Sequence, residues 1–253
     1  MNTQDLILSR RRFLKTSALA AGAILGSESL TNSLEASQIP PSQLHNEHSI
    51  PMMNTQGSHQ VRGRMFFTKD KDFEILSVAV QRIFPNDDLG PGAIELGVPY
   101  FIDNQLAGSY GNNVREYMQG PFKKGSPTQG YQTPMIRQEI FLQGILELDK
   151  ESFKRFKKSF TDIPEKSQDI ILKDFESNKV SMQKIQSSYF FSLLREMTLC
   201  GIYADPIYNG NDDKKGWKMK QFPGAQMSYL AFIEDKNFQK IPPMSLADMQ
   251  KGE

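Results

Sequence analysis

The spacing of apolar residues along the chain predicts a helical protein. Over several stretches after residue 65, apolar side chains recur every three or four positions, as on the buried face of a helix. Alternating runs of β-branched residues, which are typical of strands, are nearly absent. We therefore predict a single compact all-α domain with long ordered loops. The predicted helices run from Thr68 as N-cap to Phe84, from Pro99 to Gly108, from Thr133-Pro134 through Leu148, from Pro164 through Glu176, and from Ser187 or Ser188 through Met197.

Residues at the expected helix starts support these boundaries. The hydroxyl groups of Thr68, Thr133 and Ser187 can accept hydrogen bonds from the free N–H groups of a first turn. Proline has no N–H group and already has a helical φ, so Pro99 and Pro164 fit the first turn of a helix. The apolar side chains on the inward faces form the predicted core: Phe73, Leu76, Val80, Ile83, Phe84, Phe101, Ile102, Leu106, Ile140, Phe141, Ile145, Leu148, Ile171, Leu172, Phe175, Phe190, Leu194 and Met197.

Long segments marked by glycine and proline lie between the predicted helices, over residues 85–98, 108–132 and 201–225. Long irregular segments inside a compact domain are usually functional or shaped by a partner. The last of them contains Trp217, the single tryptophan, together with other aromatic residues. Two interpretations stay open for these aromatic side chains, a small local core or anchors of a protein interface.

The first 36 residues have the layout of an export signal. A basic stretch precedes a short run of Ala, Leu, Ile and Gly over residues 16–26, which is too short to span the ~30 Å hydrocarbon core of a membrane. Paired arginines before Phe-Leu-Lys match a twin-arginine signal, and the alternative is a basic amphipathic start to a cytoplasmic helix. We predict a signal peptide over 1–36, cleaved near Ala36 or kept as an anchor, then a flexible polar linker over 37–64 and a helical domain over 65–253. The candidate signal residues are Arg10, Arg11, Phe13, Leu14 and Lys15.

The composition is that of a soluble globular protein. Of the 253 residues, 38% are apolar and 23% are charged, and 30 basic against 29 acidic residues leave a net charge of +1. Such a balance gives no strong positive potential for binding a nucleic-acid backbone. The twin-arginine route exports proteins that are already folded. We therefore expect a cofactor or a partner to be installed before export.

The residue types that most enzymes use for nucleophilic or zinc chemistry are missing from the predicted domain. The three histidines, His45, His48 and His59, fall in the predicted linker, and none follows. This excludes Ser–His and Cys–His pairs and histidine-based zinc sites from the domain. The single cysteine, Cys200, is expected to be a small buried residue; an intermolecular disulfide is the alternative.

Two sequences resemble ligand-binding loops but fail their patterns. Gly90-Pro91-Gly92 begins like a dinucleotide-binding loop, but Glu95 stands where the third glycine is required and no strand precedes it. The segment from Asp205 resembles a calcium loop, but Ile207 and Gly216 occupy positions that need oxygen ligands. Neither sequence therefore predicts a site.

Pairs of carboxylates are the remaining candidates for chemistry. Adjacent acids in turns are commonly helix caps or partners of salt bridges, and only a raised pKa in a cleft would make one a general acid. We therefore predict no catalytic, cofactor-binding or metal residue on this chain. The pairs are Asp87-Asp88, Glu147 with Asp149, and Asp212-Asp213.

Three groups of short sequence blocks together resemble one family. The first group is IFPNDDLGPGA over residues 83–93, GVPYFID over 97–103 and LAG over 106–108. The second is Tyr117 with GPF over 120–122, and the third is DPIYNGN over 205–211, GWK over 216–218 and FPGA over 222–225. In this order the blocks are similar to the gluconate 2-dehydrogenase subunit 3 family, over residues 66–230 and the leader. Cys200 and Asn209 stand where that family usually has a glutamate and a glycine.

The resemblance implies a non-catalytic small subunit of a heterotrimer. Its large subunit would be an FAD-containing dehydrogenase of the glucose–methanol–choline type that oxidises a sugar, a sugar acid or a polyol. A cytochrome c subunit with haem c would pass the electrons to the quinone pool. The small subunit would use the twin-arginine translocase to carry the large subunit to the periplasm, support its folding or flavin loading, and stay at the inner membrane through the complex.

Our hypothesis for the contact with the large subunit is the third group of blocks. Turns that contain proline and capped residues lose little entropy on docking. The alternatives for the whole chain are a self-sufficient exported helical enzyme that uses carboxylates, and a ligand-binding or peripheral membrane protein. The predicted interface residues are Asp205, Pro206, Tyr208, Gly210, Asn211, Trp217, Pro223 and Gly224.

Overall fold

A computed structural model describes residues 62–123 and 125–250, and within them the chain is helical, with isolated β-bridges and no strand. The prediction of an all-α fold is confirmed. The predicted signal residues and nearly all of the predicted linker lie outside the described residues. The helices are α2 (Asp70–Ile83), α3 (Val98–Ala107), α4 (Arg137–Phe156), α5 (Glu165–Glu176), α6 (Ser187–Tyr203), α7 (Lys215–Lys220) and α8 (Leu246–Gln250), with 3-10 turns η1 (Pro127–Gln129), η2 (Pro206–Tyr208), η3 (Asp212–Lys214) and η4 (Leu230–Phe232).

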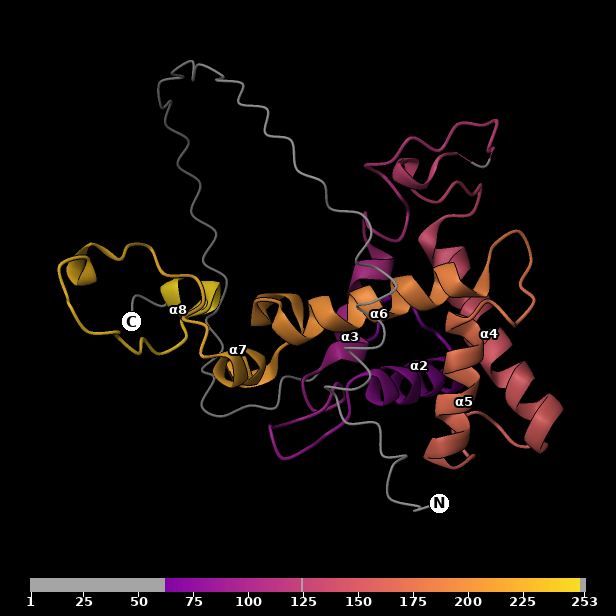
Figure 1. The fold of residues 1–253 in the computed structure, drawn as a ribbon, viewed down its shortest axis with the longest axis horizontal. Helices are drawn as coiled ribbons and strands as arrows, with labels where there is room; N and C mark the ends of the chain where they lie inside the picture. Colours follow the sequence, from indigo (N-terminus) through magenta and orange to yellow (C-terminus); the bar gives the residue numbers. More distant parts are fainter. Residues whose placement is uncertain (1–61, 124, 251–253) are drawn as a thin grey trace, which may run out of the picture.

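Helix α6 is the axis of the helical body. It contacts α2, α3, α4 and α5 along its length and α7 beyond its C-terminal end. In Figure 1, α6 runs through the body, with α4 and α5 beside its first turns and α7 near its last. None of the helices in the described parts of the chain is long and apolar enough to cross a membrane.

The first half of α6 is packed through aromatic rings. Phe190 is completely buried and makes edge-to-face contacts with Phe141 of α4 and Phe175 of α5, each at 5.8 Å between ring centres. Gly144 of α4 faces the same ring, and a Cβ on Gly144 would overlap the ring carbons of Phe190. The absence of a side chain at this position therefore lets α4 approach α6 closely.

The second half of α6 uses another glycine in the same way. A Cβ on Gly201 would lie 2.9 Å from the ring of Phe101 and 3.2 Å from Val98, both on α3. Helix α3 thus packs closely against the last turns of α6, just before the chain continues to α7. This close contact fixes the position from which the α7 region is built.

The helix starts predicted from Pro99 and Pro164 are correct, and those predicted from hydroxyl caps, for α2, α4 and α6, are wrong. Helix α3 has Pro99 in its first turn and ends at Gly108, and α5 follows Pro164 directly. Helix α2 has Lys69 at its N-cap instead of Thr68, with no side-chain capping bond. Thr133 accepts a hydrogen bond from the amide of Met135 (3.2 Å), and α4 begins only at Arg137.

The predicted cap of α6 is also displaced by one residue. Ser187 is the first residue of the helix, and Gln186 occupies the N-cap position. The buried hydroxyl of Ser187 donates to the carbonyl of Phe175 (3.1 Å), so it joins α6 to the end of α5. A tertiary contact has taken the place of the expected cap.

Candidate partner-binding site

The segment over residues 205–225, called the α7 segment below, is more ordered than the sequence predicted. Helix α6 continues to Tyr203, into the region expected to be irregular, and η2, η3 and α7 follow. The carboxylate of Asp205 accepts a hydrogen bond from the amide of Ile207 (3.1 Å) and so caps η2, which begins with Pro206. The turns between these short helices use positive φ angles at Asn209, Asn211, Lys214 and Gln221.

The α7 segment packs directly on the end of α6. Gly210 lies against the backbone of Gly201, and a Cβ on Gly210 would overlap that backbone. Asn211 is fully buried, where its amide nitrogen donates to the carbonyl of Ala204 (2.8 Å) and its amide oxygen accepts from the amide of Gly216 (2.7 Å). A single side chain thus joins the end of α6 to the start of α7.

Trp217 belongs to a local core within this segment. Its side chain is 5% exposed, and its ring nitrogen donates to the carbonyl of Tyr203 (2.8 Å). The ring of Phe222 packs edge-to-face against the Trp217 ring, with 5.5 Å between the ring centres. Gly224, at φ 74°, has no side chain and leaves room for the far edge of the Trp217 ring. Of the two interpretations left open for Trp217, the structure favours the local core, and the exposed face of the segment consists of other residues.

The loop over residues 85–97 packs against the α7 segment. The amide of Asp212 donates to the carbonyl of Leu96 (3.3 Å), and Lys215 forms an ion pair with Glu95 (2.8 Å). A Cβ on Gly90 would lie 2.6 Å from the sulfur of Met219. Figure 1 shows this loop, in purple to magenta, beside α7. The 85–97 loop of the first group and the third group of sequence blocks, joined by contacts between residues more than 100 positions apart, therefore form one surface.

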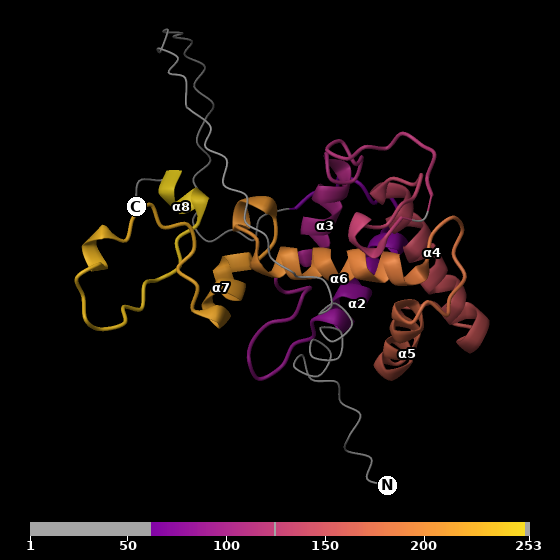
Figure 2. The ribbon, with the colours of Figure 1, turned by 45° about the horizontal axis from the view of Figure 1, so that its top comes forward.

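The second group of blocks lies elsewhere. The loop over 108–132 extends from the side of the body near α3 and α4, away from α7 (Figures 1 and 2). Arg137, at the start of α4, lies over the ring of Tyr110 at 4.3 Å, and burial raises the pKa of that tyrosine. Tyr117 is 82% exposed. The first part of this loop, around Tyr110, packs on the start of α4, and the loop does not take part in the α7 surface.

The predicted interface residues divide into a buried and an exposed set. Gly210, Asn211 and Trp217 are buried and hold the α7 segment together. Tyr208 is 51% exposed, and two residues of the same blocks that were not among the predicted interface residues, Ile207 and Phe222, are 46% and 48% exposed. The half-buried residues Asp205, Pro206, Pro223 and Gly224 shape the backbone between them.

Ionic contacts attach the flanking residues to this surface. The guanidinium of Arg62 pairs with the carboxylate of Asp212. Helix α8 is held by an ion pair between Lys214 and Asp248 (2.6 Å) and by a hydrogen bond from the amide of Leu246 to Asp205 (2.8 Å). The chain on either side of the family-like region thus closes back on the α7 segment.

Attachment of α8 is expected to weaken in acid. The hydrogen bond from Lys214 and that from the Ser245 amide lower the pKa of Asp248 from 3.8 to about 2. The folded pKa is the lower one, so this contribution is complete above pH 3.8 and is lost as the pH falls through about 2. Asp248→Asn should therefore expose residues 244–250 to faster amide hydrogen exchange at neutral pH, and the difference from the wild type should vanish near pH 2. Asp235→Asn, in a residue without an ion pair among the described residues, is the control; equal exchange in both variants would contradict the assignment.

The carboxylates of Glu147 and Asp149, one of the pairs that the sequence offered for chemistry, both make structural contacts. Glu147 pairs with Lys150 (2.7 Å). Asp149 binds Lys71, the hydroxyl of Ser159 (2.6 Å) and the amide of Phe160 (3.0 Å). Burial alone would raise the pKa of Asp149, but these hydrogen bonds outweigh it and lower the pKa. A carboxylate with a lowered pKa is ionised at neutral pH and is a poor general acid.

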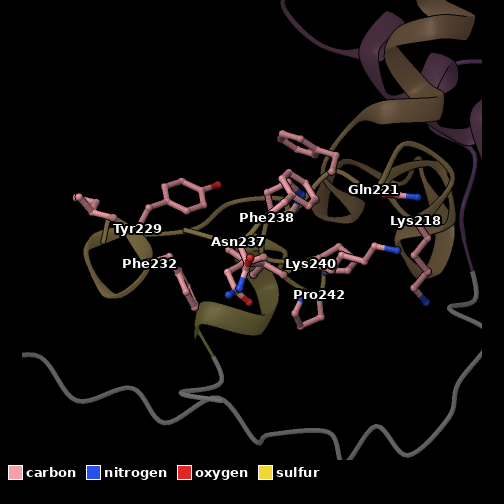
Figure 3. Close-up of a pocket in the computed structure, with 14 residues that line it drawn as sticks. Lys218, Gln221, Tyr229, Phe232, Asn237, Phe238, Lys240 and Pro242 are labelled. Carbon is pink, nitrogen blue, oxygen red and sulfur yellow. The ribbon is translucent and has the colours of Figure 1, made fainter. Parts of the chain in front are cut away.

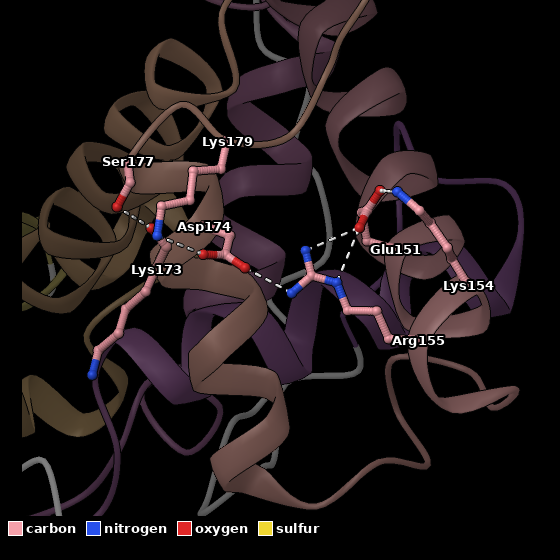
Figure 4. A network of polar contacts seen from close by, with 7 residues as sticks. All are labelled: Glu151, Lys154, Arg155, Lys173, Asp174, Ser177 and Lys179. Carbon is pink, nitrogen blue, oxygen red and sulfur yellow. Dashed lines mark hydrogen bonds and ion pairs between the residues drawn. The ribbon is translucent and has the colours of Figure 1, made fainter.

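A network of ion pairs joins α4 to α5 (Figure 4). Arg155 bridges Asp174 (2.6 Å) and Glu151 (3.0 Å), and its hydrogen bond lowers the pKa of the Asp174 carboxyl. Lys154 and Lys179 complete the network. Within the described residues, no group of three or more His, Cys, Asp or Glu side chains is arranged to hold a metal ion.

The prediction that Cys200 is buried is wrong. The cysteine lies on the exposed face of α6, and partial burial together with the nearby Glu196 carboxylate raises the pKa of its thiol. A raised pKa keeps the thiol protonated and unreactive at neutral pH. Ser192, Glu196 and Cys200 are all exposed and lie four residues apart, so the helical period of α6 already places Cys200 on the outer face.

Comparison with known proteins gives one match. Residues 70–224 match the family model described as gluconate 2-dehydrogenase subunit 3. No curated protein and no solved structure matches the chain. The matched range covers well over half of the chain, and it contains both the 85–97 loop and nearly all of the α7 segment.

Proposed function

The chain belongs to the gluconate 2-dehydrogenase subunit 3 family, and from this premise we propose that it is the escort subunit of an exported FAD-dependent dehydrogenase. The family name makes the chain the small subunit of a dehydrogenase complex. In our proposal the large flavoprotein subunit oxidises a sugar, a sugar acid or a polyol. A cytochrome c subunit with haem c then receives the electrons and passes them to quinone at the inner membrane.

The observation that supports this function is the surface formed by the α7 segment and the 85–97 loop. Both belong to the matched range, and internal contacts such as those of Asn211 and Trp217 fix their backbone before any partner binds. A surface that is already ordered loses little conformational entropy on docking, so more of the contact energy appears as affinity. Tyr208, with Ile207 and Phe222, supplies the exposed apolar groups that such a contact buries.

The proposed route of export depends on the N-terminal arginines. The small subunit carries the twin-arginine signal, and the flavoprotein folds, takes up FAD and crosses the membrane bound to it. The folded subunit therefore has to hold its partner tightly in the cytoplasm. A preformed docking surface meets this requirement better than one that folds only on binding.

Changing both arginines of the signal should block the export of two proteins at once. In the double variant Arg10→Lys, Arg11→Lys, we expect both the small subunit and the flavoprotein to stay in the cytoplasm, because only one signal serves the pair. Cell fractionation with flavin fluorescence measures this outcome. Arg12→Lys, which leaves the adjacent arginine pair intact, is the matched control. Normal flavoprotein export in the double variant would refute the escort role.

The existence of the complex can be tested independently of export. The tagged chain, purified under mild conditions from its native host, should bring down larger chains that show flavin and haem bands in the visible spectrum. A colourless chain that purifies alone and oxidises an alcohol would favour a self-sufficient enzyme. Such a result would remove the basis of the proposed function.

A further inference from the structure

Residues 226–243, called the C-terminal loop below, lie beyond the family-matched range and project from the end of the body past α7 (Figures 1 and 2). Backbone hydrogen bonds close the base of the loop: the amide of Ala225 donates to Met244 (2.8 Å), and that of Met244 donates to Pro223 (3.0 Å). The Lys214–Asp248 ion pair holds the returning chain. The loop is therefore continuous with the α7 segment and anchored to it at both ends.

The C-terminal loop exposes large apolar side chains. Met227, Leu230, Ile233 and Phe238 are 87%, 78%, 68% and 85% exposed. Single exposed apolar residues are common, but several within one short loop mark an interaction site. No described part of the chain covers them.

A cavity of about 680 Å³ lies between the C-terminal loop and α7. Its walls are mainly aromatic and aliphatic, from Phe222, Tyr229, Phe232 and Phe238 among others. Figure 3 shows Lys218 and Lys240 at the side of the cavity that faces α7. Neither ammonium group forms an ion pair with any residue that the structure describes, so two positive charges border an apolar hollow.

We propose that the C-terminal loop and this cavity form the recognition site for the flavoprotein large subunit. The cavity takes apolar side chains of a partner segment, and carboxylates next to them in that segment pair with Lys218 and Lys240. This inference rests on the proposed function and adds to it the place and the chemistry of the contact. An apolar anchor in a pocket with flanking charge pairs is the usual arrangement of an interface hot spot.

The charges of the loop favour a protein over a membrane as the occupant. The loop carries two acidic and two basic residues, and the acidic pair Glu234-Asp235 directly follows the exposed Ile233. Anionic lipid headgroups would repel this pair at the depth where the apolar groups insert. A second copy of the chain is disfavoured as well, because a symmetric contact centred on the cavity would bring Lys218 and Lys240 of both copies together.

The test removes the exposed apolar groups without touching the buried core. In the full chain, Leu230→Ser with Phe238→Ser should weaken binding to the purified flavoprotein about 100-fold, since each buried side chain is worth roughly a factor of ten. The matched control is Leu146→Ser with Ile170→Ser, two residues of α4 and α5 that are each 52% exposed. The control should bind as tightly as the wild type. Lys218→Glu with Lys240→Glu should weaken binding too, and that loss should shrink as salt concentration rises.

The possible outcomes separate this inference from the proposed function. If the wild-type chain does not bind the flavoprotein at all, the proposed function fails and the inference fails with it. If the wild type binds and the Leu230/Phe238 variant binds equally well, only the inference is overturned. With flavoprotein affinity unchanged, two further results would assign the site to another occupant and overturn the inference. The variant could lose binding to phosphatidylglycerol vesicles, or light scattering could show that a wild-type dimer becomes a monomer in the variant.

Discussion

Gly144→Ala is expected to destabilise the protein by about 3 kcal/mol, although alanine is the better helix former. The added Cβ would overlap ring carbons of Phe190, a completely buried side chain that Phe141 and Phe175 hold in place by edge-to-face contacts. The ring cannot move without opening the α4–α5–α6 core, so the helices themselves must separate. Thermal unfolding should show a melting temperature lower by roughly 6–12 °C.

Two comparisons isolate the overlap with Phe190 from other effects of the alanine. Gly108→Ala adds the same methyl group at the end of α3, where the nearest atom would be 3.6 Å away and φ is −96°, and it should be nearly neutral. In a Phe190→Leu background the cost of Gly144→Ala should fall, because the smaller side chain leaves room. An equal cost in both backgrounds would show that the clash with Phe190 is not its cause.

Helix starts could be predicted from the sequence where the deciding interaction is local. Pro99 and Pro164 act on their own φ angles and on their own missing N–H groups, and both mark helix starts in the structure. Thr133-Pro134 gives an equally good local pattern, yet α4 begins three residues later, at Arg137. The amide of Arg137 donates to the side chain of Asn113 (2.9 Å), 24 residues earlier, and such a distant partner leaves no trace in a local pattern.

The conformation of the α7 segment could not be predicted from the sequence. The sequence blocks drew attention to residues 205–225, but α7 is only six residues long and has no apolar period to detect. Its position depends on the close contacts of Gly210 and Gly216 with the backbone of α6 and on positive φ angles in the turns. The sequence identifies the aromatic residues of this segment, but which of them are buried depends on this packing. The C-terminal loop follows the last sequence block, and its apolar residues have no helical spacing, so the sequence did not identify it as part of the surface.

Asn211→Ala is expected to dismantle the α7 segment. The change leaves the carbonyl of Ala204 and the amide of Gly216 without their partner in a buried setting, at about 1–3 kcal/mol each. It also puts alanine at φ 52°, a left-handed conformation that costs roughly 1–2 kcal/mol outside glycine and asparagine. A loss of about 4 kcal/mol in total follows, most of it confined to residues after Tyr203. Hydrogen exchange should report fast opening of α7, and affinity for the flavoprotein should fall at least tenfold.

Asn209→Ala distinguishes the buried amide bridge from the backbone conformation. Asn209 has nearly the same backbone, at φ 66°, but its side chain makes no hydrogen bond among the described residues. Its replacement should cost only the conformational part, roughly 1–2 kcal/mol, and should leave partner binding nearly intact. If both variants open α7 equally, the Asn211 side chain is not what holds the segment to α6. If Asn211→Ala opens α7 but the flavoprotein still binds normally, the α7 segment is not part of the docking surface, because a detached segment cannot present Tyr208 in a fixed position.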